Sequence, residues 1–284
     1  MDKKIILQKL DRAKNLPTLP TVALKVNEML NDYDVSVDQL TKVLEKDQSI
    51  VLKLLKLVNS AFYGFKSKIK NIPHAVTLMG YNTLRNAVIT VSVIDAFKIQ
   101  DQIEGFDINK FWFHSIEVAV IAKYLSENTR LHPAEETFTF GLLHDIGKLV
   151  QLTIFSDLFK SILFTAKEKN ISYFEAEQQL SIMSHARMGA YLAQKWLLPQ
   201  DFVEVIKYHH IIKEGHSNYN SIVVIHIADM LSNATIGIDC MMNQLHRLNP
   251  ETKTLLLKAL KCMPVWFPKA QAEIKTASQF FMEE

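Results

Sequence analysis

Apolar residues recur every three or four positions along most of this chain, which is the spacing of amphipathic helices. Val22, Val26 and Leu30 follow this pattern in an early segment, and Ser36 begins a capping-box sequence ahead of the next one. No alternation of apolar and polar residues longer than four positions favours a strand. The pattern therefore predicts an all-helical protein.

The same spacing divides the chain into two parts. It predicts helices over residues 21–30, 47–61 and 83–97 in the first half, and over 108–128, 133–153, 173–180, 184–196, 199–212, 221–235, 250–261 and 268–282 in the second. Residues 101–107, which include Gly105, have the composition of a connector. We therefore place a boundary there, with one helical lobe at residues 1–105 and a second domain at residues 106–284.

Composition and charge narrow the class of protein. The chain has 48% hydrophobic and 22% charged residues, enough for a globular core, and its net charge of +2 gives no reason to expect nucleic acid or an anionic membrane as partner. Its two cysteines form no CxxC pair, and its apolar stretches are shorter than the roughly 20 residues of a membrane span. We expect a cytoplasmic protein.

Histidines and aspartates in the predicted helices of the second half carry the candidate chemistry. Imidazole and carboxylate groups bind divalent transition metals, and one carboxylate can bridge two ions. A single histidine at a helix end is more often exposed or paired with the helix dipole, so the case depends on the whole set. His226, three residues before Asp229, is interpreted as a core residue. The candidate ligands are His114, His144, Asp145, His185, His209, His210 and Asp229.

The run His-Asp-Ile-Gly-Lys at residues 144–148 is the most specific local signal. It places two ligand types side by side, a glycine that permits close approach of another segment, and a cation one turn later. Adjacent residues of a helix point about 100° apart, so His144 would bind one ion while Asp145 reached between two. Lys148 could then hold a phosphate oxygen.

Taken in order, these residues resemble the H…HD…H…HH…D pattern of the HD superfamily of metal-dependent phosphohydrolases. The resemblance implies that all seven candidates are metal ligands, that Asp145 bridges two ions, and that Lys148 contacts phosphate. Asp145 and Lys148 are then the expected catalytic residues. In that interpretation two divalent ions, with iron or manganese favoured and nickel or zinc as alternatives, hold the phosphate while Lys148 offsets charge in the transition state.

Sequence motifs, most of them in the first half of the chain, identify the branch of the superfamily. Several segments resemble the HDOD family: residues 16–20 (LPTLP), 57–64 (LVNSAFYG), 75–80 (AVTLMG), 84–86 (LRN), 189–192 (GAYL) and 196–199 (WLLP). The resemblance runs from about residue 16 to about residue 231. It implies an HD-type helical bundle with an N-terminal helical HDOD lobe.

Two functions follow from this resemblance. HDOD proteins resemble bacterial signalling modules of two-component or cyclic-nucleotide systems, and many lack the metal ligands that this chain keeps. The chain is therefore either a phosphohydrolase acting on a phosphoester or nucleotide, or a non-catalytic module whose N-terminal lobe binds a signalling protein. The Gly-Tyr-Pro signature of the cyclic di-GMP-hydrolysing HD-GYP branch is missing after His210, and Lys110 replaces the glutamate expected one turn before His114.

A third function, nucleic-acid binding, rests on a stretch rich in lysine. The lysines are interleaved with aromatic residues that could stack on bases. Lysines beside a helix core are more often solvated and such aromatics more often packed, so we do not expect nucleic acid. The residues concerned are Lys53, Lys56, Lys66, Lys68 and Lys70, with Phe62, Tyr63 and Phe65.

Overall fold

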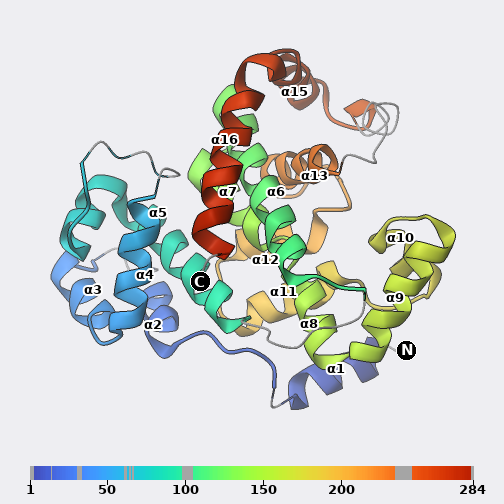
Figure 1. Cartoon of the computed structure of the whole chain (residues 1–284), viewed down its shortest axis with the longest axis horizontal. Helices are drawn as coiled ribbons and strands as arrows, with labels where there is room; N and C mark the ends of the chain where they lie inside the picture. The colour runs from blue at the N-terminus through green and yellow to red at the C-terminus, as the bar shows by residue number, and fades with distance from the viewer. Residues whose placement is uncertain are drawn as a thin grey trace.

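The computed structural model describes residues 3–13, 15–30, 34–60, 63, 65, 67–97, 105–233 and 245–282. Within these ranges the secondary structure is helical and contains no strand, so the predicted all-helical class is confirmed (Figure 1). Part of the predicted connector (residues 101–104) and part of the lysine-rich stretch (Phe62 and Lys66) lie outside the described residues.

Four of the first five helices build a small helical unit at one end of the molecule (Figure 1). Ser36 caps α3 through the predicted capping box with Gln39, and Asp47 caps α4. The helix that continues from residue 72 includes the predicted helix 83–97, but Gly80 has a positive φ of 76° and bends it. The helices of this unit are α2 (Thr21–Met29), α3 (Val37–Leu44), α4 (Gln48–Val58) and α5 (Ile72–Ala96), whereas α1 (Lys3–Arg12) lies against the larger bundle.

The remaining helices form a larger bundle. α6 runs through its middle and packs against α7, α13 and α16, while α11 packs against α8 and α12 (Figure 1). These helices are α6 (Ile108–Thr129), α7 (Ala134–Leu143), α8 (Ile146–Ile154), α9 (Ser156–Lys169), α10 (Tyr173–Gln179), α11 (His185–Lys195), α12 (Gln200–Tyr208), α13 (Tyr219–Ser232), α15 (Pro250–Lys261) and α16 (Met263–Met282).

Two clusters of buried apolar side chains form the core. One lies among α2 to α5, between Ala23 and Val91, and the other joins α6 to α16 with the end of α5. Ile6 and Leu10 of α1 belong to the second cluster, although they come first in the sequence. The boundary at residue 105 stays a prediction.

Several predicted helix bounds were wrong where candidate ligands lie. The segment predicted as one helix over residues 133–153 is two helices, α7 and α8, separated by a turn at His144 and Asp145. The helix predicted over residues 199–212 ends at Tyr208, immediately before His209 and His210. These four ligand candidates therefore sit at helix ends, as does His185, the first residue of α11 (His185–Lys195).

Two helices were not predicted, and one starts earlier than expected. α1 and α9 have no counterpart among the predicted segments, and α16 begins at Met263 with Pro268 inside it. No single helix of the described part is long and apolar enough to cross a membrane. Residues 134–154 and α9, which meet at a bend of 119°, are together long and apolar enough for a membrane span, by length and composition only.

Candidate metal centre

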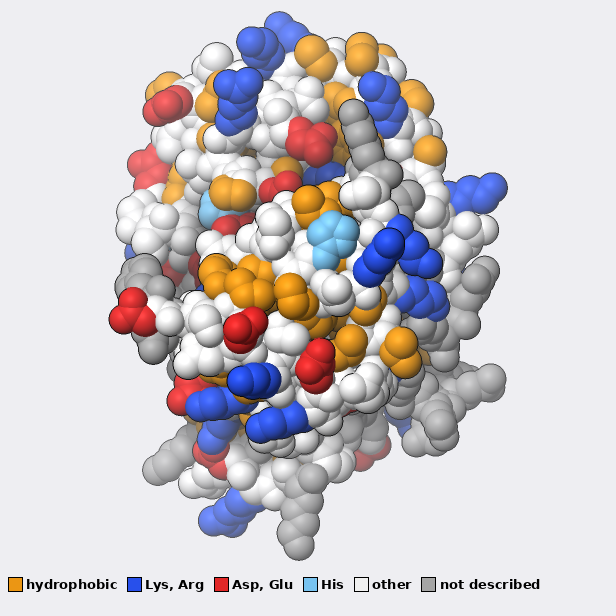
Figure 2. Space-filling view, turned by 90° about the vertical axis from the view of Figure 1, so that its left-hand side faces the viewer, with side chains coloured by type: hydrophobic (Ala, Val, Ile, Leu, Met, Phe, Trp, Pro, Cys, Tyr) orange, Lys and Arg blue, Asp and Glu red, His pale blue; other side chains and the backbone are white. Residues whose placement is uncertain are grey.

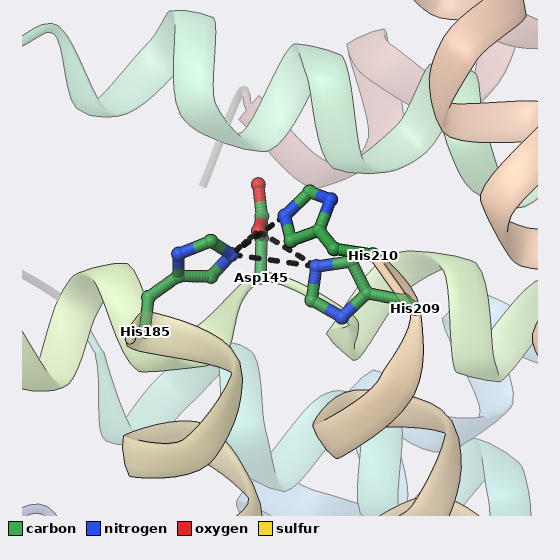
Figure 3. Close-up of side chains that lie close together, drawn as sticks. All are labelled: Asp145, His185, His209 and His210. Atoms are coloured by element: carbon green, nitrogen blue, oxygen red, sulfur yellow. Dashed lines mark hydrogen bonds and ion pairs between the residues drawn. The ribbon is translucent and has the colours of Figure 1, made fainter. Parts of the chain in front are cut away.

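The seven predicted ligands come together at one place in the larger bundle. One ligand atom each from Asp145, His185, His209 and His210 lie within 4.8 Å of one another, and the same holds for His114, His144 and Asp229. We call the first set the His185 group and the second the His114 group. Figure 3 shows the His185 group, with three imidazole rings around the carboxylate.

Asp145, which is counted in the His185 group, lies between the two groups. Its Oδ1 faces the histidines of the His185 group, and its Oδ2 faces the histidines of the His114 group. Oδ1 is 3.1 Å from Nε2 of His185, whereas Oδ2 is 3.4 Å from Nε2 of His144 and 3.7 Å from Nε2 of His114. The side chain is 1% exposed. The turn between α7 and α8, rather than the 100° step of a continuous helix, produces this arrangement. Asp229 completes the His114 group, with Oδ1 3.3 Å from Nε2 of His114.

The backbone orients the histidine rings so that Nε2 points into the centre. Nδ1 of His144 lies 2.6 Å from the carbonyl oxygen of Gly141, and Nδ1 of His209 lies 2.8 Å from that of Ile206. With the proton assigned to Nδ1 in each ring, Nε2 is left with a lone pair. These carbonyls lie three residues before the ring, in the last turn of a helix, where they would otherwise lack a partner.

Several of these inward-facing atoms could bind a cation. Nε2 of His185 is 3.1 Å from Nε2 of His210 and 3.3 Å from Nε2 of His209, so three ring nitrogens converge. Nε2 of His144 is buried and has no hydrogen-bond partner. Buried polar atoms are rarely left unpaired, and nitrogen with carboxylate oxygen is a ligand set for transition metals. The residues present fit a divalent metal.

The protonation states of His209, His210 and Asp145 also suit metal binding. Burial lowers the pKa of both His209 and His210 well below the usual value, and the neighbouring histidines lower it further. Burial alone would raise the pKa of Asp145, but Lys148 and His144 outweigh it and hold the pKa well below its usual range. His185 differs, because Glu177 and Asp145 outweigh burial and raise its pKa to about 9.

Lys148 lies beside the bridging position. Its Nζ is 2.5 Å from Oδ2 of Asp145 and 5.1 Å from the centre of the Tyr173 ring. The side chain is 20% exposed, so part of it is in contact with solvent. Its contact with phosphate stays a prediction.

Gly147 has the role expected from sequence. A Cβ atom added there would lie 1.8 Å from the carbonyl oxygen of His185, so only glycine lets α8 approach the start of α11 this closely. Gly189 faces it on α11, because a Cβ there would lie 2.9 Å from the Gly147 nitrogen. This contact between two backbones brings Asp145 and His185 together.

Other residues at the centre were missed by the sequence analysis. Glu177 is fully buried and binds His185, and Phe174 stacks on His210 with ring centroids 4.4 Å apart. Nothing in the local sequence distinguishes them from ordinary residues of a short helix. His226 is buried as predicted, and its Nδ1 also lies 2.7 Å from the carbonyl oxygen of His209.

The fold and this centre define a helical HD-type protein with a buried histidine and aspartate cluster. The chain belongs to the HDOD family, whose domain model matches residues 16–212. This confirms the family indicated by the sequence motifs.

Similarities to individual proteins are consistent with membership of this family. An HDOD domain protein of unknown function from Geobacter sulfurreducens has a similar structure, with a TM-score of 0.71, 24% identity, and coverage of 95% of this chain and 96% of that one. A candidate phosphohydrolase from Shewanella amazonensis has a TM-score of 0.69 and 26% identity, covering 96% and 97%. An uncharacterized protein of Treponema pallidum is 26% identical over 214 residues, which are 75% of this chain but 41% of that protein.

Proposed function

We propose that this HDOD protein is a metal-dependent phosphohydrolase that acts on a phosphoester or nucleotide in bacterial signalling. The observation that carries the proposal is the division of the Asp145 oxygens between two groups of ligand atoms. The candidate phosphohydrolase from Shewanella amazonensis, similar over almost the whole of both chains, supports the same reaction class.

Each group of side chains would hold one ion. His185, His209 and His210 would hold one, His114, His144 and Asp229 would hold the other, and Asp145 would be shared by both. Ligands of nitrogen and oxygen without thiolate suit iron or manganese, with nickel or zinc as alternatives. Two such ions supply the Lewis acidity needed for attack of water on a phosphoester.

The remaining residues act on the substrate. Lys148 turns from Asp145 to a phosphate oxygen and offsets the charge that develops there. Phe174 and Tyr173 form an aromatic wall that excludes water from the side of His210 and His185.

Metal analysis with a phosphoester screen tests this function. The purified chain, reloaded anaerobically with iron(II) or manganese(II), is expected to hold two equivalents of metal and to hydrolyse at least one member of a phosphoester and nucleotide panel. Asp145→Ala should lose both properties. Wild-type protein with two equivalents but no hydrolysis above the Asp145→Ala background would refute the catalytic role and leave a structural or sensory metal.

A non-catalytic interaction module is the second candidate, and the surface of the smaller unit favours it. Leu52 of α4 is 67% exposed and Leu78 of α5 is 41% exposed. Figure 2 views the molecule from this side and shows apolar side chains gathered among charged ones. If this function holds, the double variant Leu52→Asp with Leu78→Asp should fail to restore the phenotype of a strain that lacks the protein, whereas Asp145→Ala should restore it. The catalytic proposal predicts the reverse.

A further inference from the structure

Glu177 is a buried carboxylate whose hydrogen bonds converge on one metal-ligand candidate. Its Oε1 accepts from the backbone N–H of His185 at 2.6 Å and from Nε2 of Gln151 at 2.7 Å, and its Oε2 lies 2.9 Å from Nδ1 of His185. The side chains of Glu177, Gln151 and His185 are all fully buried. This carboxylate is therefore held entirely by donors of the protein.

The network fixes which atoms carry protons. The hydroxyl of Tyr173 donates to Oε1 of Gln151 at 2.7 Å, so the amide nitrogen of Gln151 faces Glu177. Glu177 therefore receives hydrogen bonds from an amide N–H, a backbone N–H and a ring N–H, as an ionised carboxylate requires. When metal binds, Nδ1 of His185 keeps its proton toward Glu177, and Nε2 gives up its own proton and presents its lone pair to the centre.

His185 differs in this respect from the other ring ligands. Nδ1 of His144 and of His209 each face a neutral backbone carbonyl, and Nδ1 of His114 lies 3.2 Å from the hydroxyl of Ser232. Nδ1 of His210 is 3.9 Å from Oδ2 of Asp229, beyond hydrogen-bond distance, whereas Nδ1 of His185 is within hydrogen-bond distance of the Glu177 carboxylate. A carboxylate behind a ligating histidine orients the ring and makes Nε2 a stronger donor to metal. This asymmetry favours tighter metal binding by the His185 group than by the His114 group.

We propose that Glu177 is a positioning residue that selectively strengthens metal binding by the His185 group, so that this group binds its ion more tightly than the His114 group does. The inference rests on the proposed two-metal centre. It adds that the two ions bind with unequal affinity and that one residue outside both groups controls the difference.

Glu177→Gln tests this with almost no change in size. A carboxamide offers one acceptor oxygen and an NH₂ group to a site built of three donors. When the NH₂ group faces Nδ1 of His185, that nitrogen must become the acceptor, and the ring proton moves to Nε2. The protonated Nε2 then points into the centre and opposes the metal. The other amide orientation places the NH₂ group against the NH₂ group of Gln151 and the backbone N–H of His185, so that donor faces donor.

The measurement is a titration of the metal-free full chain with cobalt(II) chloride, followed by calorimetry and by the visible absorption of bound cobalt. Wild type is expected to bind two equivalents. In Glu177→Gln the affinity for one equivalent should fall about 10- to 100-fold, the range typical of partners behind a metal ligand, while the other changes less than about twofold.

Glu175→Gln is the matched control. Glu175 lies two residues earlier on α10, is exposed, and forms a capping box with Ser172. Glutamine preserves such a box, as Gln39 does in α3, so this variant loses the same charge without touching His185. Both of its cobalt affinities should equal those of wild type.

The outcomes separate this inference from the proposed function. Wild type that binds no cobalt would overturn the metal centre and the inference together. Two equivalents in wild type with unchanged affinities in Glu177→Gln, or with equal losses for both equivalents, would overturn the role of Glu177 alone. If circular dichroism shows that Glu177→Gln does not fold, Tyr173→Phe replaces it. Loss of its hydroxyl frees Gln151 to rotate and should weaken the same equivalent, and no selective change would overturn the proposal.

Discussion

Nζ of Lys148 lies 2.5 Å from Oδ2 of Asp145, the oxygen that also faces His144 and His114. The lysine thus occupies the position from which a cation can neutralise charge on the His114 side of the centre. Its side chain also passes over the ring of Tyr173, which limits its directions. A substrate phosphate that reaches the centre would compete with Asp145 for this ammonium group.

Removal of the Lys148 ammonium should slow hydrolysis without removing metal. For Lys148→Ala we expect a loss of about 100-fold in kcat/KM on any phosphoester that wild type hydrolyses, because one charge-stabilising donor is lost from the transition state. Metal content, measured by elemental analysis, should stay at the wild-type level. Lys160→Ala on the exposed face of α9 is the control and should leave both unchanged. Loss of metal in Lys148→Ala would show that the lysine supports Asp145 instead.

The close approach of α8 and α11 should make Gly147 intolerant of any side chain. In Gly147→Ala the new Cβ would meet the carbonyl group of His185 at 1.8 Å, and backbone atoms cannot move aside as a flexible side chain can. We expect the free energy of unfolding to fall by about 3 kcal/mol or more, the upper range of overpacking effects. Urea denaturation measures this free energy. Ser161→Ala, on the exposed face of α9, is the control and should lie within about 0.5 kcal/mol of wild type. A Gly147→Ala variant of wild-type stability would contradict the packing described here.

Much of the fold was predictable because most helices carry a regular apolar stripe. The same regularity hid the break between α7 and α8, since Leu142, Leu143, Ile146 and Leu149 are all buried and keep a helical spacing across it. The break depends on tertiary contacts that no local pattern records. α9 was missed for the opposite reason, because its exposed face is long and only Phe159 and Ile162 are buried.

The candidate site was predictable only in part. The ligands were found because their order along the chain matches a family pattern, which no single histidine could have shown. Glu177 could not be found in this way. Glu175 and Glu177 are two positions apart in the same short helix, yet the first is exposed and the second fully buried. Only the fold shows which of the two carboxylates faces His185.

Metal affinity should rise with pH because His185 must lose a proton to bind. Its pKa in the metal-free protein is about 9, since Glu177 and Asp145 outweigh burial, so Nε2 is protonated at neutral pH. His209 and His210, with pKa values held well below the usual value by burial, contribute no such proton. For the His185 group we expect the cobalt affinity to rise up to about tenfold per pH unit between about pH 6.5 and 8. Calorimetry in buffers of different ionisation enthalpy should show proton release, and pH-independent affinity would contradict it.

Metal should also stabilise the fold, since the proposed ligands join α6, the turn between α7 and α8, α11, the end of α12, and α13. An ion at about 100 times its Kd adds about 2.7 kcal/mol to the free energy of unfolding, which corresponds to a rise of about 5 °C or more in Tm. Thermal denaturation of metal-free and cobalt-loaded wild type measures this shift, and a chelator should reverse it. Asp229→Asn, which alters a ligand candidate counted in the His114 group, should retain part of the shift, whereas Asp145→Ala should lose all of it because both groups share Asp145. A full shift in Asp145→Ala would mean that cobalt stabilises the chain from somewhere else.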